Sequence, residues 1–280
     1  MAAVAISTSL QRTYRYLRIG VAGTVVVIFV SVLLAVPVVG WLTSVSDYFY
    51  SPARDAFVGA LIAASLALLA LSGTGAERAL LDAAALFAPL IALVPTTLAP
   101  GAVPGVDVPC TTRCFPPAFE ADVDNGVATY LIVGTLTVLV ALLLVALGQV
   151  SRSAVWATAA VAVPVLAIVG GLWAFAREAF LQQGHFVATI AFFGLFAAVA
   201  ILNAFPRRGA PPAPIFRVLY TAIALLLVID LVIYIALLPG ADASGIPIVL
   251  IAEAIALTLF FAFWVVQGIE KWDDTDPRLI

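Results

Sequence analysis

The sequence predicts an all-α polytopic membrane protein, in which residues 1–280 form a single transmembrane helix bundle of about eight spans. Three observations predict this fold class. Charged residues make up 10% of the chain, against roughly 25% in soluble domains. Mean hydropathy is +1.17. Apolar runs of about 20 residues, the length that crosses a bilayer as a helix, recur along the whole sequence.

Each predicted span is a long apolar run that ends at a short polar or proline-containing connection. We expect helices throughout, because a helix satisfies its own backbone polar groups in hydrocarbon and the sequence lacks the alternation of a β-barrel. The spans cover approximately residues 19–43, 56–73, 80–98, 127–148, 154–176, 185–205, 217–238 and 246–269.

The distribution of cations predicts a multi-pass protein of the cell membrane with both termini in the cytoplasm. In this orientation the extracytoplasmic cations are Arg54, Arg113 and Arg177. The larger cytoplasmic set follows the positive-inside rule. It comprises Arg12, Arg15, Arg18, Arg78, Arg152, Arg207, Arg208, Arg217, Lys271 and Arg278.

The longest connection, residues 99–126, is therefore expected to be extracytoplasmic. It contains both cysteines of the chain, Cys110 and Cys114, in the segment CTTRC. Two cysteines four residues apart in an exported loop indicate a disulfide, with free thiols as the alternative. A metal site would need more ligands, and the single histidine is distant in the sequence. We therefore expect no metal and no cofactor.

Ionisable residues within spans are the best functional candidates, because burying one in lipid costs several kcal/mol unless it faces a partner or water. Asp230 lies in the seventh predicted span and Glu253 in the eighth. Counting about 1.5 Å per residue from the outer span ends places both carboxylates at a similar depth. The pattern predicts that they share a site.

Four residues at the outer ends of other spans extend this candidate cavity: Asp47, Arg54, Asp55 and His185. Each has a simpler interpretation. Asp55 can stabilise a helix N-terminus, and Arg54 can form a rim ion pair with Asp47 or Asp55. His185, which we expect to open the sixth span, can be an interfacial hydrogen-bonding residue.

The segment SDYFYSPARDAFVG, which begins at Ser46, resembles a family of uncharacterised prokaryotic polytopic membrane proteins. The resemblance extends to Val94-Pro95-Thr96, to His185 and to Glu253. It implies a multi-span fold and no particular activity. A more distant likeness is to the ceramidase and adiponectin-receptor superfamily, whose zinc site uses three histidines. This chain has one histidine, so His185, Asp230 and Glu253 are the only substitute for that site.

Three classes of function remain, and we favour the first because acids lie at membrane depth. The first is a protein whose outward-facing polar cavity binds or transports a cation, a proton or a polar or lipid head group. The second is an intramembrane lipid hydrolase or transferase, with an Asp or Glu as general base and His185 as acid. The third is a non-catalytic membrane scaffold or assembly partner. We expect membrane lipids as partners and no nucleic acid, because the sequence has no basic face.

Overall fold

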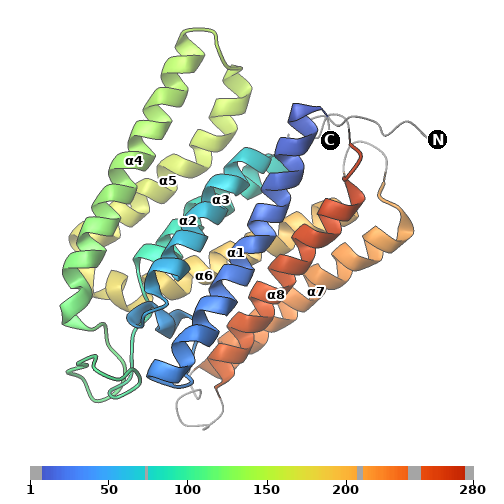
Figure 1. The fold of residues 1–280 in the computed structure, drawn as a ribbon. Helices are drawn as coiled ribbons and strands as arrows, with labels where there is room; N and C mark the ends of the chain where they lie inside the picture. Colours follow the sequence, from blue (N-terminus) through green and yellow to red (C-terminus); the bar gives the residue numbers. More distant parts are fainter. Residues whose placement is uncertain (1–7, 73–74, 207–210, 239–246, 275–280) are drawn as a thin grey trace.

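Eight α-helices and two short 3-10 helices make up the described part of the chain, residues 8–72, 75–206, 211–238 and 247–274 of a computed structural model (Figure 1). Seven of the α-helices are long and apolar enough to cross a membrane, which agrees with a multi-pass membrane protein. The elements are α1 (Ser9–Val39), η1 (Ser46–Tyr50), α2 (Arg54–Leu71), α3 (Gly75–Leu93), η2 (Pro117–Phe119), α4 (Glu120–Ala146), α5 (Arg152–Phe175), α6 (Arg177–Ala204), α7 (Pro214–Leu237) and α8 (Ile248–Glu270).

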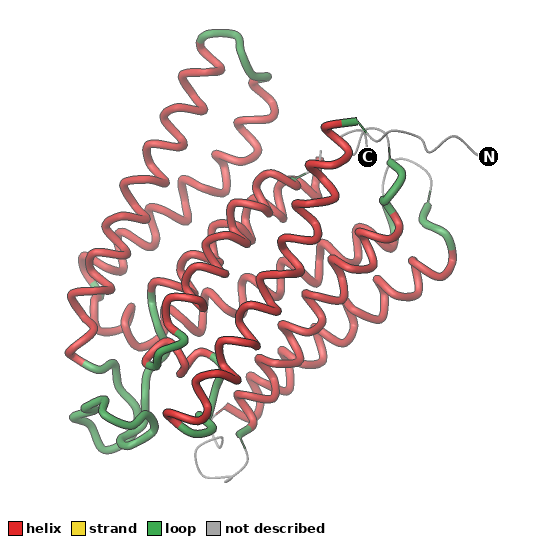
Figure 2. Tube along the Cα trace, viewed as in Figure 1, coloured by secondary structure: helices red, strands yellow, loops and turns green. Residues whose placement is uncertain are grey.

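Six helices form a closed ring in which each packs against the next, in the order α1, α2, α3, α6, α7, α8 and back to α1. The α4–α5 hairpin packs outside this ring, against α3 and α6. Its far end stands clear of the other helices (Figure 2). Leu136, Leu139 and Leu143 of α4 are each more than half exposed, as a lipid-facing surface requires.

Aromatic side chains fill the middle of the ring. Phe196 of α6 stacks edge-on against Phe263 of α8, with ring centroids 4.8 Å apart, and both are fully buried. Trp264 lies beside them at 1% exposure. Because large side chains close the ring at this level, the bundle has a packed core here rather than an open channel.

Helix α3 corrects the third predicted span. It begins at Gly75 and ends at Leu93, five residues before each predicted limit of 80–98. Its end is early because Pro95 disfavours helix in the preceding residue. Among the eight described α-helices, α3 is the one that is not apolar enough to cross a membrane by itself, since it carries Glu77, Arg78 and Asp82. Its acids are paired instead: Thr158 of α5 donates to Asp82 at 2.5 Å, and Asn203 of α6 donates to Glu77 at 3.0 Å.

Each of the other seven predicted spans coincides with an α-helix, with differences at the ends. Helix α1 begins ten residues before its predicted limit, at a capping box formed by Thr8 and Gln11. Helix α6 begins at Arg177, so His185 lies two turns inside it and does not open the span as predicted. Arg177, which directly follows the predicted fifth span of 154–176, is the first residue of α6.

The two ends of the described chain lie at the same end of the bundle. Arg15 donates to the carbonyl of Trp272 at 2.7 Å, and Arg18 donates to that of Lys271 at 3.2 Å. Both ends of the described chain therefore lie at one end of the bundle, and the cytoplasmic placement of that end stays a prediction. Three of the cations used for the prediction lie outside the described residues: Arg207, Arg208 and Arg278.

Candidate functional site

The connection between α1 and α2 folds back into the opposite end of the ring, where the chain from 94 to 116 also lies; we call this the loop end. Helix α1 stops at Gly40, whose positive φ of 78° suits a glycine. The Tyr48 hydroxyl donates to the Gly40 carbonyl at 3.1 Å and accepts from the Leu42 amide at 3.3 Å. These bonds turn η1 inward, and all five of its residues are buried.

A reciprocal pair of hydrogen bonds shapes the start of η1. The Ser44 amide donates to Asp47 Oδ2 at 3.1 Å, while the Asp47 amide donates to Ser44 Oγ at 2.8 Å. The Thr43 hydroxyl also donates to Asp47 Oδ2, at 2.5 Å. Asp47 has no exposed surface, and this burial raises the pKa of its carboxyl above the ordinary value, against the opposing effect of Thr43.

Ser46 connects two candidate residues that are far apart in the sequence. Its amide donates to Glu253 Oε2 at 3.1 Å, and its hydroxyl lies 2.8 Å from Glu253 Oε1. The same hydroxyl lies 2.9 Å from His185 Nε2. All three residues are at most 8% exposed. We call Ser46, His185 and Glu253 the Ser46 cluster.

The second nitrogen of His185 identifies its tautomer. Nδ1 lies 2.8 Å from the carbonyl oxygen of Val94, which can only accept a hydrogen bond, so Nδ1 carries a proton. Both ring nitrogens are therefore occupied by protein partners, and neither is available to a metal. In the described residues no three His, Cys, Asp or Glu side chains come together as a metal site requires.

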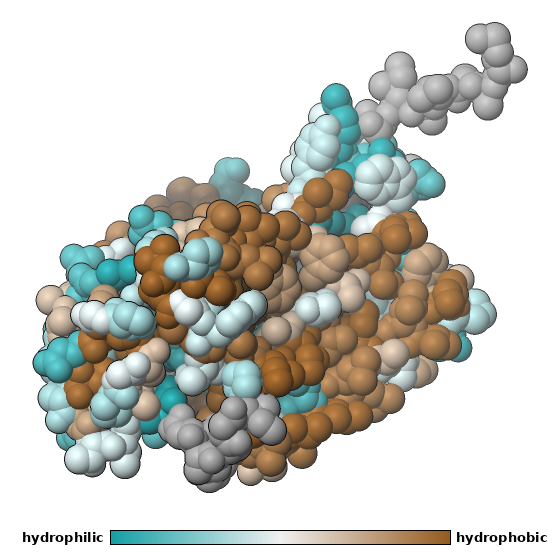
Figure 3. Space-filling view, turned by 60° about the horizontal axis from the view of Figure 1, so that its bottom comes forward, coloured by the Kyte–Doolittle hydropathy of each residue, from teal (hydrophilic) through white to brown (hydrophobic). Residues whose placement is uncertain are grey.

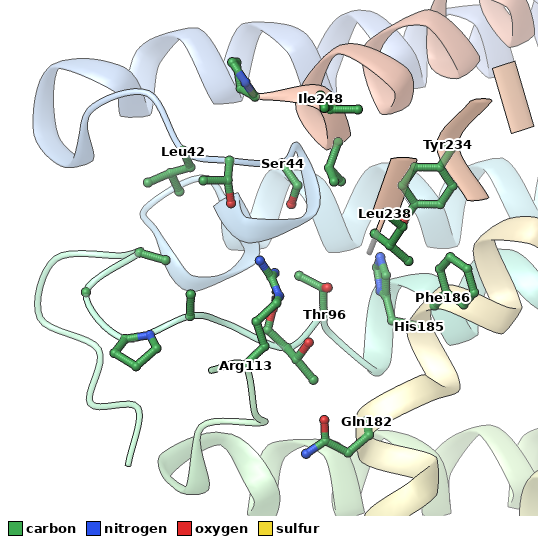
Figure 4. Close-up of a pocket in the computed structure, with 18 of the residues that line it drawn as sticks. Leu42, Ser44, Thr96, Arg113, Gln182, His185, Phe186, Tyr234, Leu238 and Ile248 are labelled. Carbon is green, nitrogen blue, oxygen red and sulfur yellow. Dashed lines mark hydrogen bonds between the residues drawn. The ribbon is translucent and has the colours of Figure 1, made fainter. Parts of the chain in front are cut away.

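A cavity of about 650 Å³ opens at the loop end, between the α1–η1 connection, the 94–116 chain, α6, α7 and α8 (Figure 4). One wall is polar, with Ser44, Thr96 and Arg113, and the other is apolar and aromatic, with Phe186, Tyr234 and Leu238 (Figure 4). Four further residues that line the cavity are Trp41, Thr43, Gln182 and Ile248. His185 lies between the two walls. A cavity of this size and mixed lining is typical of sites for small amphipathic molecules.

Arg113 reaches this cavity from the disulfide loop. Cys110 and Cys114 form a disulfide with Cα atoms 6.2 Å apart, as predicted. Residues Leu98 and Cys114 pair through two backbone hydrogen bonds of 3.0 Å, which fix the base of the loop. Arg113 then donates to the Thr97 carbonyl at 2.6 Å and lies 4.0 Å from Asp47 Oδ1. The disulfide loop and η1 thus contact each other through Arg113 and Asp47.

Asp230 and Glu253 line one small cavity, together with Thr189 of α6 and Tyr234 of α7. Its volume of about 10 Å³ is near the least that holds one water molecule. Thr189 Oγ1 is buried and has no hydrogen-bond partner in the described part of the chain. The two acids are therefore neighbours, but neither is among the residues that line the 650 Å³ cavity.

Arg54 and Asp55 belong elsewhere. Both line a separate cavity with Phe49 and Asp122, and none of its lining residues lines the 650 Å³ cavity. Arg54 donates to Asp122 at 2.7 Å and lies 4.5 Å from the centre of the Phe49 ring. The rim ion pair expected with Asp47 or Asp55 is thus made with Asp122. The six candidate residues do not line one common cavity.

Sequence reasoning missed Ser46 and Arg113. Ser46 lies next to Asp47 in the SDY motif, but a serine is not ionisable and is common in loops, so the motif alone does not indicate a functional serine. Arg113 had a signal in its position inside the predicted disulfide loop. Comparisons with protein-family models, with curated proteins and with solved structures found no match.

Proposed function

We propose that this integral membrane protein binds the anionic head group of an amphipathic lipid in the loop-end cavity, with that end outside the cell. The observation that carries the proposal is Arg113, a guanidinium held over a cavity whose facing wall is aromatic and aliphatic. Guanidinium groups recognise phosphate and carboxylate through paired hydrogen bonds. The apolar wall suits the first part of an acyl or prenyl chain.

Two features favour a head group over a metal cation. The charged side chain among the described lining residues is a cation, Arg113, and the acids Asp230 and Glu253 lie behind the wall. The surface around the loop end also suits an amphipathic molecule: hydrophilic and neutral residues gather over the loops, and apolar residues cover the helices beside them (Figure 3).

The test is binding of short-chain phosphatidylglycerol to the purified protein in detergent, measured by calorimetry, with short-chain phosphatidylcholine and inorganic phosphate as comparison probes. We expect preference for phosphatidylglycerol and a loss of about tenfold or more for Arg113→Gln, since a charged hydrogen bond contributes about 1.5–3 kcal/mol. Arg113→Lys should lose less. Arg54→Gln, which removes the cation of the separate rim cavity, is the matched control and should bind like wild type.

Equal binding of the two lipids, or equal binding by Arg113→Gln and wild type, contradicts the proposal. Binding of inorganic phosphate as tight as that of phosphatidylglycerol would identify a free anion as the ligand instead.

A second candidate, lipid hydrolysis or acyl transfer, is favoured by the 2.9 Å distance from Ser46 Oγ to His185 Nε2, which is the contact of a nucleophile with its general base. Ser46 does not line the large cavity, so this reaction needs a movement that exposes it. A fluorophosphonate probe tests it: label on wild type that is absent from Ser46→Ala supports the hydrolase.

A further inference from the structure

The hydrogen atoms of the Ser46 cluster can be counted. The contacts from Ser46 Oγ to His185 Nε2 and to Glu253 Oε1, at 2.9 and 2.8 Å, each need one hydrogen. Ser46 supplies one of them. His185 Nδ1 already donates to the Val94 carbonyl. The second hydrogen must therefore come either from a protonated Glu253 or from a doubly protonated His185.

We propose that Glu253 and His185 hold one exchangeable proton in common, which the Ser46 hydroxyl passes between them. In one form Glu253 is a carboxylic acid that donates to Ser46, and Ser46 donates to a neutral His185. In the other form Ser46 donates to the Glu253 carboxylate, and an imidazolium donates to Ser46. Transfer breaks the O–H bond of Glu253, forms one at Ser46, breaks the original O–H bond of Ser46 and forms the N–H bond at Nε2. Charge is conserved.

The surroundings favour the neutral form at rest. Beside the cluster, α1 and α2 contribute a mostly apolar wall of Thr24, Val25, Ile28, Phe57, Leu61 and Ala64. An ion pair in such surroundings loses much hydration energy. The ionisable groups that face the cluster are Asp47 from η1, with Arg113 behind it, and Asp230 and Tyr234 from α7.

The shared proton connects the acids to the large cavity. His185 lines that cavity, whereas Glu253 lies behind it beside Asp230. Movement of the proton onto His185 places a positive charge at the cavity wall and leaves a negative charge in the interior. The shared proton is thus a property additional to lipid binding, because the charge at the cavity wall depends on the protonation of the buried Glu253.

The single histidine makes the test direct. Protein labelled with ¹⁵N-histidine gives one imidazole, and its Nε2 resonance reports whether that nitrogen accepts or carries a hydrogen. With ¹³C-labelled glutamate, Glu253 is identified as the carboxyl signal absent from Glu253→Gln. In a pH titration of wild type in nanodiscs we expect the His185 and Glu253 signals to change together, with a common midpoint.

Ser46→Ala should abolish the common midpoint, and Ser46→Thr, which keeps a hydroxyl, should restore it. In Glu253→Gln, the His185 signal should no longer change at the midpoint that it shares with Glu253 in wild type. Ser65→Ala is the matched control, because Ser65 is an equally buried serine whose hydroxyl donates to the Ala85 carbonyl at 2.6 Å, away from the cluster. Independent midpoints in wild type, or a common midpoint retained in Ser46→Ala, overturn the proposal. Neither outcome depends on whether the cavity binds lipid.

Discussion

At the residue scale, the loop end depends on polar groups that are buried with their partners. Asp47 accepts from Thr43 and Ser44 and has no exposed surface. A buried polar group that loses its partner costs about 1–3 kcal/mol, whereas one satisfied hydrogen bond contributes less. Removal of the Asp47 acceptor oxygen should therefore destabilise the loop end, whereas a substitution that keeps an acceptor oxygen there should have a smaller effect on stability.

We predict that Asp47→Ala lowers the free energy of unfolding by about 2 kcal/mol, because it leaves the Ser44 amide and Thr43 hydroxyl without their acceptor. Asp47→Asn keeps an oxygen for both donors and should lose clearly less. Denaturant unfolding in one fixed detergent measures both variants. Equal losses would show that the charge of Asp47, and not its acceptor oxygen, stabilises η1.

The raised pKa of Asp47 also predicts a pH dependence. The folded state binds this proton more tightly than the unfolded state, so the contribution of Asp47 to stability is complete below its unfolded pKa of about 3.9. It decreases as the pH rises through the folded value. As the pH rises from the unfolded to the folded pKa of Asp47, the free energy of unfolding of wild type should fall relative to that of Asp47→Asn. Parallel pH profiles of the two proteins would contradict this.

At the scale of the helices, close packing of α6 against the end of α3 positions His185 beside the Val94 carbonyl. A Cβ atom added at Gly184 would lie 3.2 Å from Cγ1 of Val94, the residue whose carbonyl accepts from His185. Valine is short and branched, so it has little freedom to move aside. The glycine allows α6 to approach the end of α3 at this point.

We expect Gly184→Ala to destabilise the protein by about 1 kcal/mol or more through this overpacking. Gly194→Ala is the matched control, since it lies in the same helix and an added Cβ meets nothing within 4 Å. Alanine there should be neutral or slightly stabilising. The measurement is the unfolding midpoint of each variant in the same detergent; equal shifts would contradict the packing argument.

Charged pairs hold the α4–α5 hairpin at the loop end. Arg177 at the start of α6 binds Asp124 and Glu120 of α4, and the Trp173 indole of α5 donates to Asp124 at 2.9 Å. These groups are about a third or more exposed, so their effect on global stability is small. Their role is to orient three helix ends.

At the scale of the whole molecule, the fold is a closed ring of six helices with one hairpin outside it. The aromatic core closes the ring between the loop end and the end that carries Arg18 and Lys271. Binding at the loop end therefore needs no movement of the ring, whereas passage through the bundle would need these aromatic side chains to separate. This difference favours binding over transport.

The orientation of the whole bundle is open to a direct test. After mild reduction, a membrane-impermeable maleimide added to intact cells should label Cys110 and Cys114, and without reduction it should not. The control is Gln149→Cys in a chain without the native cysteines, because Gln149 is exposed at the opposite end of the hairpin. It should react only after the cells are permeabilised. The reverse pattern would place the loop end inside.

The sequence by itself determined the helical class and the approximate positions of the helices, and it indicated the disulfide, because apolar length and cysteine spacing are local properties of the chain. It also indicated His185 and Glu253, since ionisable groups are rare in such helices. Only the tertiary structure decided their partners. Ser46 of η1 is 139 residues from His185 of α6 and 207 residues from Glu253 of α8 in the sequence, and no local pattern encodes which helix faces meet. The closure of the ring brings them within hydrogen-bond distance, while it places Arg54 and Asp55 in another cavity.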